Sequence, residues 1–133
     1  MSKLKVSKTK QELLNNTIAF YSEDVTRRAY DEEGGQCMYY TKDGRTCAIG
    51  RELKSPSTFG VKSGETDGSI GSPALMGELP KRLRDMGASF LDDIQGLHDS
   101  ERYWNIPESK LSDKGRIRVR DICNVYDLIS PLS

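Results

Sequence analysis

A cysteine, a histidine and an aspartate carry the most suggestive chemistry in this sequence. Cys47 lies where we expect a short helix to begin, and the helix dipole at that position favours a thiolate. His98 is the single histidine, so it alone has an ordinary pKa near neutral pH, and Asp99 follows it directly. The three residues could therefore form a thiol-dependent catalytic site. Because no family-specific signature surrounds them, we favour the alternative in which Cys47 packs as a small apolar side chain and His98 borders the core.

The cysteines also raise the question of a metal site. Four residues could supply tetrahedral ligands to zinc, namely Cys37, Cys47, His98 and Cys123. However, nine residues separate Cys37 from Cys47, whereas structural zinc sites usually contain closely spaced cysteine pairs, so we expect no metal and no other cofactor. The three cysteines suit free thiols in a reducing cytosol, and the basic N-terminus lacks the apolar stretch of a secretory signal.

Length and charge narrow the class of protein. The 133 residues suit one domain, 1–133, with residues 1–8 flexible at its start. Lysine plus arginine and aspartate plus glutamate each number 20, so the formal net charge is zero, which argues against nucleic acid as the partner. No apolar run is long enough to span a bilayer, so we expect no membrane partner. The sequence leaves open whether the chain forms a homo-oligomer.

Turn chemistry predicts a β-hairpin from about Gln36 to Cys47. Asp43-Gly44 is a strong turn signal, because both residue types tolerate a positive φ, and strand-forming residues flank it. A two-residue loop would pair Tyr40 with Cys47, whereas a three-residue loop with a bulge at Gly44 would pair Tyr39 with Cys47. We expect a helix to begin at Cys47 and to end before Pro56.

Apolar periodicity and proline positions predict the remaining helices. Thr9 to Glu12 is a capping-box pattern that opens a helix from about Lys10 to the mid-twenties. Pro73 and Pro80 divide the region after Gly71 into short helical pieces.

Two further helices follow in the C-terminal half. One begins near Ser89 and carries an apolar stripe that reaches Trp104. The last contains Ile122, Val125, Tyr126 and Ile129 and is halted by Pro131. The alternating segment Arg116–Arg120 could be a strand, but we favour a helix. The sum is an α+β fold: a mostly helical single domain with one β-hairpin packed on three or four helices.

A long glycine- and serine-rich loop, residues 55–72, separates the two halves of the chain. Loops of this length are usually functional or disordered, and we expect a mobile connection. The candidate contact surface combines the Gly60–Gly71 part of this loop with the hairpin, and the binding residues that we single out are Tyr39, Tyr40, Arg45, Lys62 and Trp104. For Trp104 a place in the core is favoured over an exposed anchor.

The chain resembles a loose group of small uncharacterised proteins from bacteriophages and bacterial genomes. The resemblance rests on short motifs, which are Cys37-x-Tyr39, Asp43-Gly44-Arg45-x-Cys47-Ala48-Ile49-Gly50 and Leu97-His98-Asp99 followed by Trp104. The glycine-rich segment 55–72 departs from the compact pattern of the group. The resemblance implies a phage or mobile-element product in a bacterial cytosol. Small phage proteins of this kind often bind a host protein or a defence component.

The function that we expect is therefore non-catalytic binding to a bacterial host or defence protein. A thiol- or zinc-dependent enzyme that uses Cys47, His98 and Asp99 is one alternative. The other is a small-ligand or nucleotide sink, in which the glycine-rich loop closes over a phosphate and Lys62 or Arg45 supplies the opposite charge.

Overall fold

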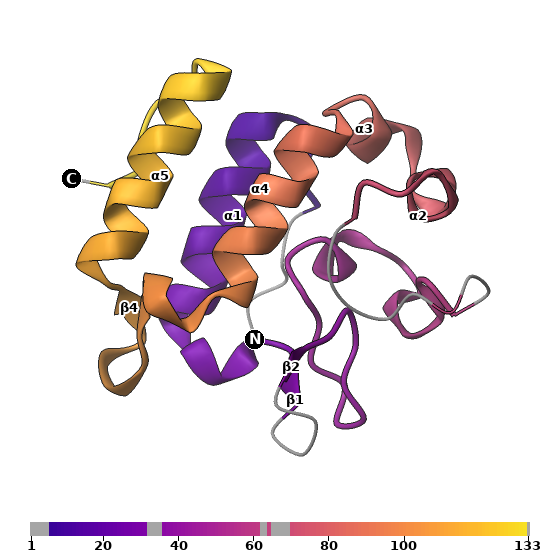
Figure 1. The fold of residues 1–133 in the computed structure, drawn as a ribbon, viewed down its shortest axis with the longest axis horizontal. Helices are drawn as coiled ribbons and strands as arrows, with labels where there is room; N and C mark the ends of the chain where they lie inside the picture. Colours follow the sequence, from indigo (N-terminus) through magenta and orange to yellow (C-terminus); the bar gives the residue numbers. More distant parts are fainter. Residues whose placement is uncertain (1–5, 32–35, 62–63, 65–69, 133) are drawn as a thin grey trace.

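The computed structural model describes residues 6–31, 36–61, 64 and 70–132. Three longer helices, α1 (Lys10–Glu23), α4 (Ala88–Asp99) and α5 (Asp113–Tyr126), form a helical group at the left of Figure 1, in which α4 contacts both α1 and α5. Irregular chain and the short helices α2 (Pro73–Glu78) and α3 (Lys81–Arg84) lie on the other side. The fold is the mostly helical α+β arrangement that the sequence predicts.

Helix α1 begins where the capping pattern places it. The Thr9 hydroxyl accepts the amide of Glu12 at 3.1 Å, and the Glu12 carboxylate accepts the amide of Lys8 at 3.0 Å. The helix buries Leu13, Leu14, Thr17, Ile18 and Tyr21, and a 3₁₀ turn, η1 (Val25–Arg27), continues it. The start of α1 is also tied to the far end of the chain. The Gln11 side-chain amide donates to the carbonyl of Ile129 at 2.7 Å and accepts its amide at 2.8 Å.

The predicted hairpin is present at its tip but not along its whole length. A bridge pairs Tyr40 with Thr46, and Gly44 has φ +86°, which is the three-residue loop with a bulged glycine. Strand β2 (Gln36–Cys37) instead pairs backwards with β1 (Tyr30–Asp31). The hairpin predicted over about Gln36–Cys47 is therefore present from Tyr39 to Cys47, while Gln36 and Cys37 pair with an earlier part of the chain.

The helix predicted to begin at Cys47 is only one turn long. It is the 3₁₀ helix η2 (Gly50–Glu52), and a second turn, η3 (Pro56–Thr58), follows. A Cβ atom at Gly50 would lie 3.0 Å from the carbonyl oxygen of Tyr39, so this turn is pressed against the hairpin. Both ends of the segment 55–72 are anchored, since Phe59 and Ile70 are buried in the core. Residues 62–63 and 65–69 lie outside the described residues.

The prolines and caps set the boundaries of the later helices. Ser72 caps α2 and Pro73 is its first residue, while Pro80 precedes α3. Helix α4 follows Gly87, whose φ is +92°, rather than a cap at Ser89.

Helix α5 settles the interpretation of Arg116–Arg120. Ser112 caps the helix, and Arg116–Arg120 lies inside it, so the strand alternative was wrong. The helix ends at Tyr126 before a left-handed Asp127, five residues short of Pro131. Val125 and Ile129 are 71% and 80% exposed, so they do not form the predicted apolar stripe. That face of α5 is built instead from Gly115, Val119, Ile122 and Cys123.

A second hairpin was not predicted. Strands β3 (Trp104–Asn105) and β4 (Lys110–Leu111) pair antiparallel, and the turn between them contains Ser109 in the left-handed conformation. Trp104 thus lies in a strand rather than on the stripe of α4. It is nevertheless in the core, 4% exposed, and its indole N–H donates to the carbonyl of Leu97 at 2.9 Å.

None of the helices in the described segments has both the length and the apolar character that a bilayer crossing requires.

Candidate functional site

Cys47 is placed as a structural thiol. Its side chain is completely buried, and its sulfur accepts the amide of Gly50 at 3.2 Å. Burial raises the pKa of Cys47 to about 12, which outweighs the hydrogen bond from Gly50. Cys47 thus lies in the core, as in the alternative that the sequence favours. The dipole-stabilised thiolate of the other alternative is opposed here, because the helix that follows has only three residues and the side chain is buried.

His98 is buried as well, and both of its ring nitrogens are engaged. Its Nε2 accepts the amide of Ala29 at 3.1 Å, and its Nδ1 lies 2.6 Å from a carboxylate oxygen of Asp99. Burial lowers the pKa of His98, although the Asp99 carboxylate opposes this. Because Nε2 accepts a hydrogen bond, the neutral ring carries its proton on Nδ1 and donates it to Asp99. His98 therefore joins the end of α4 to the chain at Ala29.

The cysteine that lies beside His98 and Asp99 is Cys37, not Cys47. Ligand-type atoms of Cys37, His98 and Asp99 lie within 4.8 Å of one another. The half-buried Cys37 thiol donates to the carbonyl of Asp99 at 3.2 Å. Burial raises the pKa of Cys37 to about 11, so this sulfur is also a neutral thiol.

An arginine packs against this cluster. The Arg28 guanidinium lies 3.5 Å from the sulfur of Cys37 and donates to the carbonyls of His98 at 2.7 Å and Asp99 at 2.8 Å. A metal on Nδ1 of His98 would require a proton on Nε2, facing the N–H of Ala29. The four ligands considered from the sequence do not gather within the described residues, since neither Cys47 nor Cys123 belongs to this group. We interpret Arg28, Cys37, His98 and Asp99 as a hydrogen-bonded structural cluster that connects the end of α4 to the chain near Ala29.

The buried histidine predicts how stability depends on pH. An unfolded chain has a histidine pKa near its ordinary value of 6.5, and the folded state lowers it. Between these values only the unfolded chain binds the proton. The free energy of unfolding is therefore unaffected by protonation of His98 above pH 6.5. It decreases as the pH falls from 6.5 toward the lowered pKa of the folded state, by up to about 1.4 kcal/mol per pH unit. Urea unfolding at pH 7.5 and 5.5 measures this loss. A His98→Gln variant should be less stable at both pH values but should lose most of the difference between them, and an unchanged difference would contradict the assignment.

The residues expected to form a contact surface mostly hold the fold together. Tyr39 is 1% exposed and its ring packs 5.0 Å from that of Phe59. The Arg45 guanidinium donates to the carbonyls of Arg28 at 3.0 Å and Tyr30 at 2.9 Å. Tyr40 is half-buried and, as noted above, Trp104 is in the core. Lys62 lies outside the described residues.

Comparisons with protein-family models, with curated proteins and with solved structures find no match for this chain, so its function has to be inferred from its geometry.

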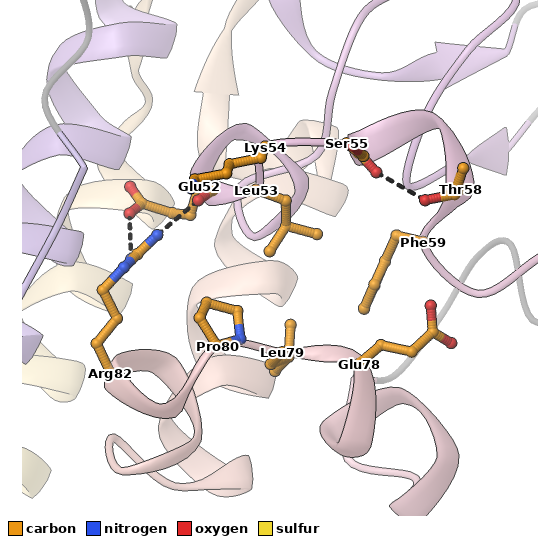
Figure 2. A pocket seen from close by; sticks show the side chains of 10 residues that line it. All are labelled: Glu52, Leu53, Lys54, Ser55, Thr58, Phe59, Glu78, Leu79, Pro80 and Arg82. Carbon is orange, nitrogen blue, oxygen red and sulfur yellow. Dashed lines mark hydrogen bonds and ion pairs between the residues drawn. The ribbon is translucent and has the colours of Figure 1, made fainter.

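One recess on the described surface lies between residues 52–59 and residues 78–82, and we call it the 52–82 groove. Its volume is about 510 Å³. Leu53 and Phe59 on one side and Leu79 and Pro80 on the other supply its apolar surface, as Figure 2 shows. Ser55 and Thr58 add hydroxyl groups to the lining. The sequence analysis missed this groove because its two walls are separated by the glycine-rich segment. The sequence signal that could have indicated the groove is the presence of apolar residues near prolines in otherwise polar stretches.

A buried ion cluster forms one end of the groove. The Glu52 side chain is fully buried and accepts hydrogen bonds from the amide of Ser7 at 2.7 Å and from its hydroxyl at 2.9 Å. The same carboxylate pairs with Arg82 at 3.0 Å and with Arg51. Arg82 also donates to the carbonyls of Ser7 at 2.8 Å and Glu52 at 2.6 Å. Ser7, in the segment expected to be flexible, is therefore fixed in the core of this cluster.

Glu78 marks the opposite end of the groove (Figure 2). It is exposed, and one of its carboxylate oxygens accepts the amide of Gly60 at 3.0 Å. Lys54, also exposed, lies on the wall that carries Glu52. The groove thus has apolar side chains in its middle and charged groups of opposite sign at its rims.

Proposed function

We propose that this chain is a non-catalytic binding protein that docks on another protein through the 52–82 groove. The observation that carries the proposal is the groove itself. Its volume of about 510 Å³ lies within the range of roughly 300–1,000 Å³ that is usual for ligand sites, and its lining combines apolar, hydroxyl and charged side chains. A recess of this kind can take one bulky side chain of a partner, which is how protein interfaces gain much of their affinity.

The chemistry of the thiols and the histidine supports binding over catalysis. A nucleophilic site requires an ionisable thiol within reach of a free ring nitrogen. Cys47 is dry and its pKa is about 12, while both ring nitrogens of His98 already have partners. The cysteine next to His98 is Cys37, and its pKa is about 11. These groups act as structural connections.

The resemblance to small phage and bacterial proteins supports a biological setting for the partner. We propose a bacterial host or defence protein, met in the bacterial cytosol. We place the contact surface at the groove and not at the hairpin, because the side chains of Tyr39 and Arg45 are used in contacts within the fold. The same commitment of Arg45 weakens the alternative of a nucleotide sink, which needs a free counter-charge.

Site-specific photo-crosslinking in bacterial cells tests the proposal. A photo-reactive phenylalanine analogue at position 54 should yield one dominant crosslinked protein. The same analogue at position 125, where Val125 is 71% exposed on α5, should not capture that protein. Binding of the purified partner, measured by calorimetry, should then weaken about five- to tenfold in Lys54→Glu, as expected for reversal of an exposed charge.

The matched control is Lys114→Glu, which makes the same charge change at an exposed position of α5. It should leave the affinity within about twofold of the original value. Equal capture from positions 54 and 125, or a five- to tenfold loss of affinity in Lys114→Glu as well, would overturn the groove as the docking site.

A further inference from the structure

We infer, building on the proposed function, that the 52–82 groove recognises an extended peptide segment in which a bulky apolar side chain stands between an acidic and a basic one. The acidic side chain lies toward Lys54 and Arg82, and the basic one lies toward Glu78. This assigns a chemistry to the partner segment that docks in the groove, which the proposed function leaves open.

The middle of the groove selects an apolar side chain. Phe59 and Leu79 are 4% and 3% exposed, so they form a packed floor rather than flexible flaps. Leu53 is half-buried and Pro80 is exposed, and these two residues face each other across the opening in Figure 2. A charged side chain placed among these four residues would lose its water without gaining an ion pair. An aromatic or large aliphatic side chain is therefore the group that fits.

One end of the groove has an excess of positive charge. Glu52 supplies one negative charge, and the guanidinium groups of Arg51 and Arg82 both pair with it. Lys54 stands exposed beside them and has no ion pair among the described residues. Three cations around one buried anion leave a field that attracts a carboxylate. The Arg82 side chain is 26% exposed, so part of that charge faces solvent.

The other end is negative. Glu78 is exposed and uses one carboxylate oxygen for the amide of Gly60. Its second oxygen has no hydrogen bond within the described part of the chain, and it can accept one from a lysine or arginine of the partner. Figure 2 places Glu78 and Arg82 at opposite ends with the apolar walls between them. Opposite charges separated by an apolar stretch fix both the residue types and the chain direction of a bound segment.

An extended peptide suits this arrangement better than a compact metabolite. The lining comes from two surface segments, and the charged groups stand at its rims rather than converging on one point. A small charged ligand would require several polar groups aimed at the same place.

Three capped pentapeptides with a central phenylalanine test the inference. They carry Glu and Lys at the ends, Lys at both ends, or Glu at both ends. We expect the Glu/Lys peptide to bind about fivefold more tightly than either of the others, because each mismatched end replaces one exposed ion pair by repulsion. Titrations followed by NMR should shift the amide signals of Leu53, Lys54 and Leu79.

Charge-reversed variants of the protein, tested with the same three peptides, provide the matched experiment. In Lys54→Glu the preference should move to the peptide with Lys at both ends, while Lys114→Glu should keep the original order. Equal affinity for the three peptides, or shifts that avoid the groove, would overturn the inference. Tighter binding of free phenylalanine than of any peptide would also overturn it, in favour of a metabolite.

The two proposals fail in different experiments. If position 54 still crosslinks one protein while the peptides show no charge preference, docking through the groove stands and the assigned partner chemistry falls. If position 54 captures nothing that position 125 does not, docking itself falls.

Discussion

Replacing Glu52 with alanine should lower the free energy of unfolding by about 3–5 kcal/mol, a large part of the roughly 5–15 kcal/mol of a typical domain. The Glu52 side chain is fully buried, and that of Arg51 is only 3% exposed. Removing the carboxylate leaves two guanidinium groups and the donors of Ser7 without their acceptor. Such uncompensated buried charge is among the most destabilising changes that one substitution can cause. Urea unfolding followed by circular dichroism measures the loss.

An exposed ion pair supplies the control for Glu52. Glu108 pairs with Lys110 at 2.7 Å, but these side chains are 54% and 64% exposed. Glu108→Ala should therefore change stability by less than about 0.5 kcal/mol. Glu52→Gln keeps one acceptor oxygen and should fall between the two alanine variants. If Glu52→Ala were no more destabilising than Glu108→Ala, the cluster would not contribute to the fold as described.

Replacing Gly115 with alanine should destabilise the protein by about 3 kcal/mol, the upper range for overpacking a rigid site. A Cβ atom at this position would clash with the carbonyl oxygen of Tyr103 and would lie 2.9 Å from a methyl carbon of Leu111. The oxygen cannot move away freely, because it accepts the amide of Ser112 at 2.9 Å. Ser112 in turn caps α5 through the amide of Gly115 at 3.1 Å. The added methyl group thus disrupts the cap and the β3–β4 hairpin together.

The same substitution in another helix should have the opposite sign. Gly96 lies inside α4, and a Cβ atom there would meet nothing within 4 Å. Gly96→Ala should stabilise the protein by about 0.5–1 kcal/mol, because alanine has the higher helix propensity. Thermal unfolding of the two variants side by side gives the comparison, and a shift of the melting temperature in the same direction for both would refute the steric argument at Gly115.

Local signals in the sequence predicted the helices well. The Thr9 and Glu12 cap, the proline at position 73 and the Asp43-Gly44 bend act over a few neighbouring residues, so their types suffice to place α1, α2 and the hairpin tip. Cys47 shows where a local signal failed. The position before a helical turn was right, but desolvation by distant side chains decides the pKa of its thiol.

Contacts between residues that are far apart in the sequence could not be predicted from it. Nothing near His98 indicates that its ring accepts the amide of Ala29, 69 positions away. From its position beside the hairpin turn, Arg45 is expected to face solvent, yet its guanidinium donates to the carbonyls of Arg28 and Tyr30. The 52–82 groove depends on two stretches that only the folded core brings together.

The paired hydrogen bonds between the Gln11 side chain and the Ile129 backbone have a consequence for synthesis in the cell. These two residues are 118 positions apart, so the ribosome needs roughly 6–24 s to produce the second after the first. Until Ile129 has been made, α1 lacks this tie, although α4, which also packs on α1, is synthesised earlier. The start of α1 is therefore fixed later than the face of the same helix that packs on α4.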